Sequence, residues 1–338
     1  MPTKEGETMT ESLTMAALYG KLSKIGLKKN YVRKNGLPSW WDDELNDKPV
    51  AALEGAGYIA KNLNLDLSSL LTPQEKVKFN RPPHTKFKQH NSQNNQHPHL
   101  AQALASRFAE LISLGVEVNY TPLPKDAKTI REDILSQQPK VDLTSLLDYC
   151  WSQGIAVGYF DHFPDKTKKF AGLIQWYSTC PVIILSSKYQ QSARLAFDLA
   201  HELGHLALAH LKDGVLVDEE ITFDNDREEK EANQFATELL LGDCDNCLGD
   251  RKFQNVERFS KYVQEHFISH HPDIDIGAII LNYGWHNRRY FALAMATLKL
   301  LEPNPNGNKI INEYLANKLD WDKFDDETYE YLEKVLGV

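Results

Sequence analysis

The stretch FDLAHELGHLALAH, residues 197–210, decides both the fold and the chemistry of this chain. Its apolar residues recur at helical spacing, so we expect one helix from about Ser192 to His210. Within it, His201 and His205 belong to an H-E-x-x-H motif, and their spacing of four residues places both imidazoles on one helix face. Such a pair suits zinc, whose catalytic sites take three protein ligands and leave a fourth position for water.

Glu202, inside the motif, is predicted to be the catalytic residue. Its carboxylate would hold a water molecule beside the metal and take its proton. Leu203 and Leu206 are expected to anchor the helix in the core, while Gly204 leaves room beside the metal. A motif this short also arises by chance, and the alternative is an amphipathic helix with two surface histidines.

A second predicted helix, starting near Arg227, offers the third metal ligand. It contains the sequence EKEAN, in which Glu229 and Asn233 lie four residues apart on one face. In that phase Glu229 reaches the metal, and Asn233 orients a ligand histidine from the second shell. Glu228 and Glu231 are neighbouring alternatives, but Glu231 points about 160° away from Glu229, so both cannot bind.

Two apolar runs before the motif predict a β-hairpin. FAGLIQWYS at 170–178 and PVIILSS at 181–187 are rich in β-branched and aromatic residues, with only Thr179 and Cys180 between them. A zinc peptidase uses an edge strand to align its substrate, so we expect the 181–187 strand to bind a peptide by β-augmentation. Further strands are predicted at 116–120 and 155–160. Helices are predicted at 50–71, 100–114, 143–151, 256–267 and 274–301.

Several other residues have two interpretations each. His210 and Tyr177 could stabilise the oxyanion of a scissile carbonyl, or they could be structural, His210 being favoured by the dipole at a helix C-terminus. Cys244 and Cys247 form a C-x-x-C pair that could be redox-active or could bind zinc with help from histidines. The simpler interpretation of the cysteines is a polar loop with two thiols. The histidines available to them would be His266, His270 and His271.

The chain divides by composition. Residues 80–99 are rich in Asn, Gln, His and Pro and predict a linker between a helical N-terminal domain at 1–79 and a larger domain at 100–302, with a helical tail at 303–338. Lys28, Lys29 and Arg33 lie in a basic stretch that could contact DNA phosphates, or could be a solvated helix face. Trp40 and Trp41 are interpreted as a core anchor, with a partner-binding patch as the alternative.

Length and composition set outer limits. The 338 residues are enough for about two domains, and the four cysteines do not make a disulfide framework. We find neither a secretory signal nor an apolar run of about 18 residues, so we expect a cytoplasmic protein with no membrane partner. The net charge of −9 argues against a general nucleic-acid coat.

HELGHLALAH, followed by EKEANQFATELLL, resembles the ImmA/IrrE family of metallopeptidases. The lead-in PVIILSSKYQQSARLAFDLA, with Arg194, and the later HPDIDIGAIILNYGW are similar to segments of that family. The resemblance implies a gluzincin-type zinc site at His201, His205 and Glu229, with Glu202 as the catalytic residue. It also implies cleavage of a repressor after stress or DNA damage, and an Xre-type helix-turn-helix at the N-terminus of longer members. Other members are antitoxins or lie beside phage-defence genes.

Together these features predict an α+β, mostly helical protein with a zincin-like metallopeptidase domain after a small helical domain, which could be a degenerate helix-turn-helix. The expected activity is zinc-dependent cleavage of a partner protein, either a repressor or the product of a neighbouring gene. Manganese is an alternative ion, since sites with two His and one Glu accept several divalent metals. Two alternatives are a DNA-binding regulator or antitoxin that keeps the fold as a scaffold, and a protein that neutralises a toxin by binding it.

Overall fold

The computed structural model describes residues 13–80, 85–88, 98–167, 169–211, 214–218 and 227–338. The protein is α+β and mostly helical, as the sequence predicts. It divides into two compact units, which are described separately. The first contains residues 1–81, 96–107 and 163–168, and the second contains residues 82–95, 108–162 and 169–338.

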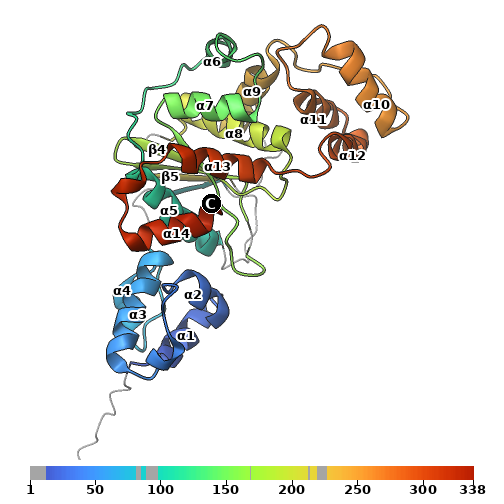
Figure 1. Ribbon diagram of the computed structural model, residues 1–338. Helices are drawn as coiled ribbons and strands as arrows, with labels where there is room; N and C mark the ends of the chain where they lie inside the picture. Colours follow the sequence, from blue (N-terminus) through green and yellow to red (C-terminus); the bar gives the residue numbers. More distant parts are fainter. Residues whose placement is uncertain (1–12, 81–84, 89–97, 168, 212–213, 219–226) are drawn as a thin grey trace, which may run out of the picture. The chain divides into compact units, whose positions relative to one another are not determined.

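The first unit is a small helical bundle, drawn in blue in Figure 1. One tryptophan of the predicted anchor is buried and the other is not: Trp41 is 2% exposed, whereas Trp40 is 56% exposed. The Trp41 ring lies against Gly55, where a β-carbon would come within 2.8 Å of it. Its helices are α1 (Met15–Ser23), α2 (Lys29–Asn35), the 3₁₀ turn η1 (Asp43–Leu45), α3 (Pro49–Asn62), α4 (Leu67–Leu71) and the first part of α5 (Pro98–Leu114).

The second unit is built on a five-stranded mixed sheet with strand order β1-β5-β3-β4-β2. The predicted hairpin is present, but its turn is one residue earlier than expected, because Tyr177 pairs with Cys180 and Ser178 adopts a positive φ of 55°. The strands are β1 (Thr85–Lys88), β2 (Ala156–Tyr159), β3 (Gly172–Tyr177), β4 (Cys180–Leu185) and β5 (Val215–Asp218).

The prediction that 181–187 is a substrate-binding edge strand is wrong. β4 is internal, because β3 pairs with it in antiparallel fashion on one side and β2 in parallel fashion on the other. Its backbone groups are therefore used within the sheet and cannot receive a peptide. Residues 116–120 form no strand either: Tyr120 instead packs edge-on against Trp176, with ring centroids 5.1 Å apart.

Helices cover both faces of this sheet. Alternate strand residues such as Ile174 and Leu185 enter a core that they share with α8. On the other face, Gly158 of β2 lies against Phe108 and Ile112 of α5. The remaining helices are α6 (Ala127–Leu135), α7 (Leu143–Ser152), α8 (Ser192–Ala207), α9 (Arg227–Leu241), α10 (Val256–Tyr262), η2 (Val263–Phe267), α11 (Ile276–His286), η3 (Arg288–Tyr290), α12 (Phe291–Leu301), α13 (Gly307–Lys318), η4 (Trp321–Lys323) and α14 (Asp326–Leu336).

Two segments have a closer relation to the sheet than the sequence indicates. The predicted linker contains β1, which pairs in parallel with β5; residues 81–84 and 89–97 of that linker lie outside the described residues. The predicted tail belongs to the second unit, because Asn312 of α13 accepts a hydrogen bond from the backbone N–H of Tyr159 at 2.9 Å. No helix among the described residues combines the length and apolar character needed to cross a membrane.

Candidate metal centre

The two helices that carry the predicted ligands pack side by side. Gly204 of α8 faces Ala232 and Phe235 of α9, and a β-carbon at this glycine would lie 3.1 Å from the Cα of Ala232. The absence of a side chain at 204 therefore permits close approach of the two helices, at a modest cost in helix propensity. The sequence prediction assigned this glycine to space beside the metal, whereas the structure shows it at the helix contact.

The predicted ligands His201, His205 and Glu229 come together in this contact. The Nε2 atoms of the two histidines are 3.0 Å apart, and each lies 3.4 Å from a carboxylate oxygen of Glu229. Both histidines are fully buried and Glu229 is 5% exposed. Within the part of the chain that the structure describes, this is the group of His, Cys, Asp and Glu side chains close enough to hold a metal ion.

These distances fit a single small ion. Ligand atoms bound at about 2.0–2.1 Å to one tetrahedral ion lie roughly 3.3–3.4 Å from each other. The observed separations of 3.0–3.4 Å match this value closely. The donor set of two imidazoles and one carboxylate is also typical of catalytic zinc sites. The residues present therefore fit the ion that the sequence motif predicts.

Each histidine ligand is oriented through its other ring nitrogen. His201 Nδ1 lies 3.1 Å from Oδ1 of Asn233, and His205 Nδ1 lies 2.8 Å from Nδ1 of His210. A histidine that binds metal through Nε2 carries its proton on Nδ1. We therefore assign these Nδ1–H groups as donors to Asn233 and His210.

The second of these contacts continues into a longer chain. Since His210 accepts at Nδ1, its proton is on Nε2, which lies 3.2 Å from Oε2 of Glu231. Glu231 in turn accepts a hydrogen bond from Arg227 at 2.7 Å, and both Arg227 and His210 hold the pKa of this carboxyl below its usual value. From the sequence, Glu231 is an alternative metal ligand. In the structure it instead contacts His210, which in turn contacts the predicted ligand His205.

The position of His210 depends on the end of α8. The helix ends at Ala207, and Ala209 adopts a left-handed φ of 57°, which turns the chain back so that the backbone N–H of His210 donates to the His205 carbonyl at 3.0 Å. His210 is therefore outside the helix and next to His205, a predicted metal ligand. This geometry favours a role in orienting His205 over the oxyanion role considered from the sequence.

Glu202 lies between α8 and the sheet. Its side chain is fully buried and runs alongside Gly172, the first residue of β3. A β-carbon at Gly172 would come within 1.8 Å of Oε1 of Glu202, so this space exists only because residue 172 is glycine. No local pattern in the sequence singles out Gly172, because the contact joins residues 30 positions apart.

An ion pair fixes the first half of α8. Arg194 Nε lies 3.1 Å from Oδ1 of Asp198, which is fully buried one helical turn before the motif. Burial raises the pKa of the Asp198 carboxyl, while Arg194 and the Ser187 hydroxyl oppose that rise. At the start of α8, the backbone N–H of Ser192 donates to Glu302 at 3.0 Å. The Arg194–Asp198 pair thus lies within α8, whereas the bond from Ser192 to Glu302 attaches the start of α8 to the end of α12.

Tyr177 is not brought to the metal centre. It lies at the opposite end of β3 from Gly172, and five residues of strand correspond to roughly 17 Å. Cys244 and Cys247 form a disulfide directly after α9, and no histidine joins them in a metal-binding group among the described residues. The cysteine–histidine zinc site, one of the interpretations considered from the sequence, is therefore not formed among the described residues.

The predicted DNA contacts lie in the first unit and differ in their surroundings. Arg33 pairs with Asp43 at 3.1 Å and also donates to the carbonyl of Trp41. Lys29 lies over the Tyr19 ring, 5.4 Å from its centroid. Lys28 is 71% exposed, with Asp165 at 3.9 Å. Arg33 therefore holds the segment after α2.

The fold and the predicted metal site resemble those of a zincin-like metallopeptidase domain. Residues 151–246 match the family model described as "IrrE N-terminal-like domain", peptidase family M78. The match confirms the resemblance to ImmA/IrrE peptidases that the sequence indicates, and it supports a metal-dependent peptidase function at the level of the family. No curated protein matches the sequence.

Proposed function

We propose that the protein is a zinc-dependent endopeptidase that cleaves a partner protein. The observation that carries this proposal is the buried cluster of His201, His205 and Glu229, with Glu202 one residue from the first ligand. A structural zinc site does not need Glu202 in addition to its ligands, whereas hydrolysis needs a base beside the metal. Manganese is the alternative ion.

His201, His205 and Glu229 would hold the ion, which when bound supplies a Lewis acid that polarises a peptide carbonyl and acidifies water. Glu202 then acts as general base and accepts a proton from the attacking water, whose oxygen forms a bond to the carbonyl carbon. The same carboxyl returns the proton to the amide nitrogen as the peptide bond breaks. The products are a carboxylic acid and an amine, which ionise to a carboxylate and an ammonium group, so protons and electrons balance.

The proposed substrate is a repressor or the product of a neighbouring gene, as the family resemblance implies. The experiment is incubation of the zinc-loaded protein with each candidate, followed by mass spectrometry of the fragments. Glu202→Gln is the matched control, because it keeps the size of the side chain and all three metal ligands. We expect cleavage by the wild type and a loss of at least about a hundredfold in the variant. Equal cleavage by both proteins would reject the proposal.

A further inference from the structure

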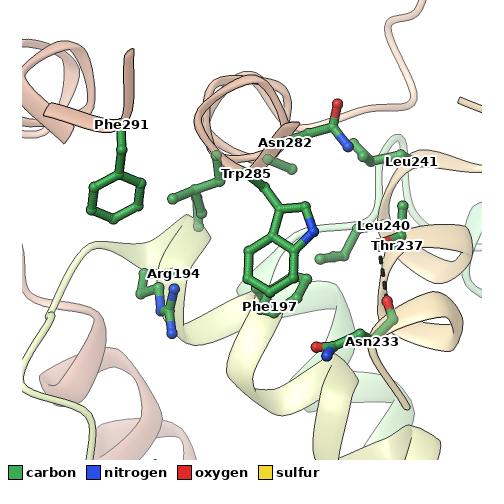
Figure 2. Close-up of a pocket in the computed structure, with 12 residues that line it drawn as sticks. Arg194, Phe197, Asn233, Thr237, Leu240, Leu241, Asn282, Trp285 and Phe291 are labelled. Carbon is green, nitrogen blue, oxygen red and sulfur yellow. Dashed lines mark hydrogen bonds between the residues drawn. The ribbon is translucent and has the colours of Figure 1, made fainter. Parts of the chain in front are cut away.

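We propose that a pocket between α8, α9 and α11 receives an apolar side chain of the substrate next to the scissile bond, and that Trp285 sets its selectivity. This inference rests on the proposed peptidase function and adds the chemical class of the residue that is recognised. Figure 2 shows the indole of Trp285 over Phe197, with Arg194 on one side and Asn233 on the other.

The pocket has a volume of about 590 Å³, part of which is open to solvent. Most of its lining is apolar. The apolar residues are Ala193, Phe197, Leu240, Leu241, Ala278, Leu281, Trp285 and Phe291. This lining suits an apolar side chain better than a polar one.

The pocket continues the metal centre along the contact between α8 and α9. Phe197 precedes His201 by one helical turn on the same face, which is about 6 Å along the axis. Asn233 follows Glu229 by one turn, lines the pocket and also binds Nδ1 of His201. An extended peptide advances about 3.3 Å per residue. A residue at or next to the scissile bond can therefore reach the pocket with its side chain.

The polar residues of the lining already have partners within the protein. Thr237 donates to the Asn233 carbonyl at 2.9 Å, and Arg194 pairs with Asp198. Asn282 accepts from the backbone of Cys247 and donates to the carbonyl of Asp245. A polar side chain entering the pocket would lose its hydration without gaining an equivalent partner, whereas an apolar one gains from burial. The pocket therefore selects apolar residues.

Trp285 is the residue best placed to set the shape of the pocket. Its ring lies 6.1 Å from that of Phe197, centroid to centroid, at an interplanar angle of 46°. It is partly exposed, and it comes from α11, beyond residues 151–246 that match the peptidase family. The catalytic residues and the residue that limits the pocket are therefore on different parts of the second unit.

The test measures binding of N-acetylated amino-acid hydroxamates, which chelate zinc, to the zinc-loaded protein by calorimetry. The probes carry leucine, phenylalanine, alanine or glutamate side chains. We expect the leucine or phenylalanine probe to bind at least about tenfold more tightly than the alanine probe, and the glutamate probe to bind no better than alanine. Trp285→Ala should widen the pocket and shift the preference toward phenylalanine, while Thr237→Trp should fill it and remove the discrimination.

Trp151→Ala is the matched control, since Trp151 is also partly exposed but does not line the pocket. It should leave the discrimination unchanged, and all variants should keep the wild-type zinc content. The inference would be overturned if the four probes bind equally or do not bind. It would also be overturned if the pocket variants leave the ranking of probe affinities unchanged. If the probes are discriminated but no protein is cleaved, the pocket stands and the proposed peptidase function fails.

Discussion

Gly172 and Glu202 share a space that admits no further atom: a β-carbon on Gly172 would lie 1.8 Å from Oε1 and 2.3 Å from Cδ of Glu202. Residue 172 begins β3 and pairs with Leu185 of β4 and Asp218 of β5, so the middle of the sheet forms one wall around the carboxylate. Because β3 is hydrogen-bonded to β4 and β5, it cannot move away to make room for an added methyl group. Glu202 would have to move instead.

Gly172→Ala should therefore lower peptidase activity without removing the metal. Loss of a correctly placed general base costs about 10²–10⁴ in rate, so we expect a decrease of at least about a hundredfold. The zinc content should stay at the wild-type value because the three ligands are untouched. Activity is measured on the cleaved partner protein and zinc by elemental analysis. Gly57→Ala is the control, because a β-carbon there meets nothing within 4 Å; unchanged activity in Gly172→Ala would contradict the assigned position of Glu202.

The hydrogen-bonded chain from His205 through His210 to Glu231 should contribute to metal affinity. Removing such outer partners typically weakens binding 10- to 100-fold, because the ligand loses its fixed orientation and tautomer. We expect His210→Ala and Glu231→Gln to weaken zinc binding by about this factor, as measured by competition with a chromogenic chelator. Glu238→Gln is the control on the same helix, where the carboxylate accepts a hydrogen bond from Gln234 at 2.9 Å. Wild-type zinc affinity in both test variants would show that these hydrogen bonds do not contribute to metal binding.

Arg33 should stabilise the first unit. Its side chain is 31% exposed, and it joins the segment after α2 to Asp43 and the Trp41 carbonyl. Arg33→Ala should therefore lower the thermal midpoint of unfolding, whereas Lys28→Ala, at a side chain that is 71% exposed, should leave it near the wild-type value. Differential scanning calorimetry of the full chain measures both. Equal midpoints for the two variants would contradict the structural role of Arg33.

Cys180 should make stability depend on pH under alkaline conditions. Burial raises the pKa of its thiol from about 9 to about 11. Between these values the unfolded chain loses a proton that the folded chain keeps, so the free energy of unfolding should fall as pH rises through this window. The observable is the difference in urea midpoint between wild type and Cys180→Ser, which should change between pH 8.5 and 10.5. A constant difference would mean that the thiol titrates normally.

Periodicity was sufficient for the elements that build the centre. The spacing of apolar residues predicted α8 and α9 close to their observed bounds, and the motif brought His201, His205 and Glu229 to one point. Local sequence carries this information for two reasons. His201 and His205 lie on one helix, and apolar residues mark the faces through which α8 and α9 pack.

The contacts between distant segments could not be predicted in the same way. β4 has the composition of any hydrophobic strand, and nothing in PVIIL distinguishes an edge position from one between β2 and β3. The proximity of Gly172 to Glu202 depends on strand register, and the position of His210 depends on the left-handed turn at Ala209. Tyr177 is a candidate for the oxyanion in the sequence because it lies next to the predicted edge strand, and the length of β3 separates it from Gly172 and Glu202.

The central claim is that His201, His205 and Glu229 hold one catalytic metal ion, and that Glu202 acts as the general base without binding that ion. The most direct measurement is elemental analysis of the purified, folded chain as wild type, His205→Ala and Glu202→Gln. We predict about one zinc or manganese per chain in the wild type and in Glu202→Gln, and loss of the metal in His205→Ala. A folded wild type that takes up no metal after incubation with zinc, or a His205→Ala variant that retains it, would contradict the claim.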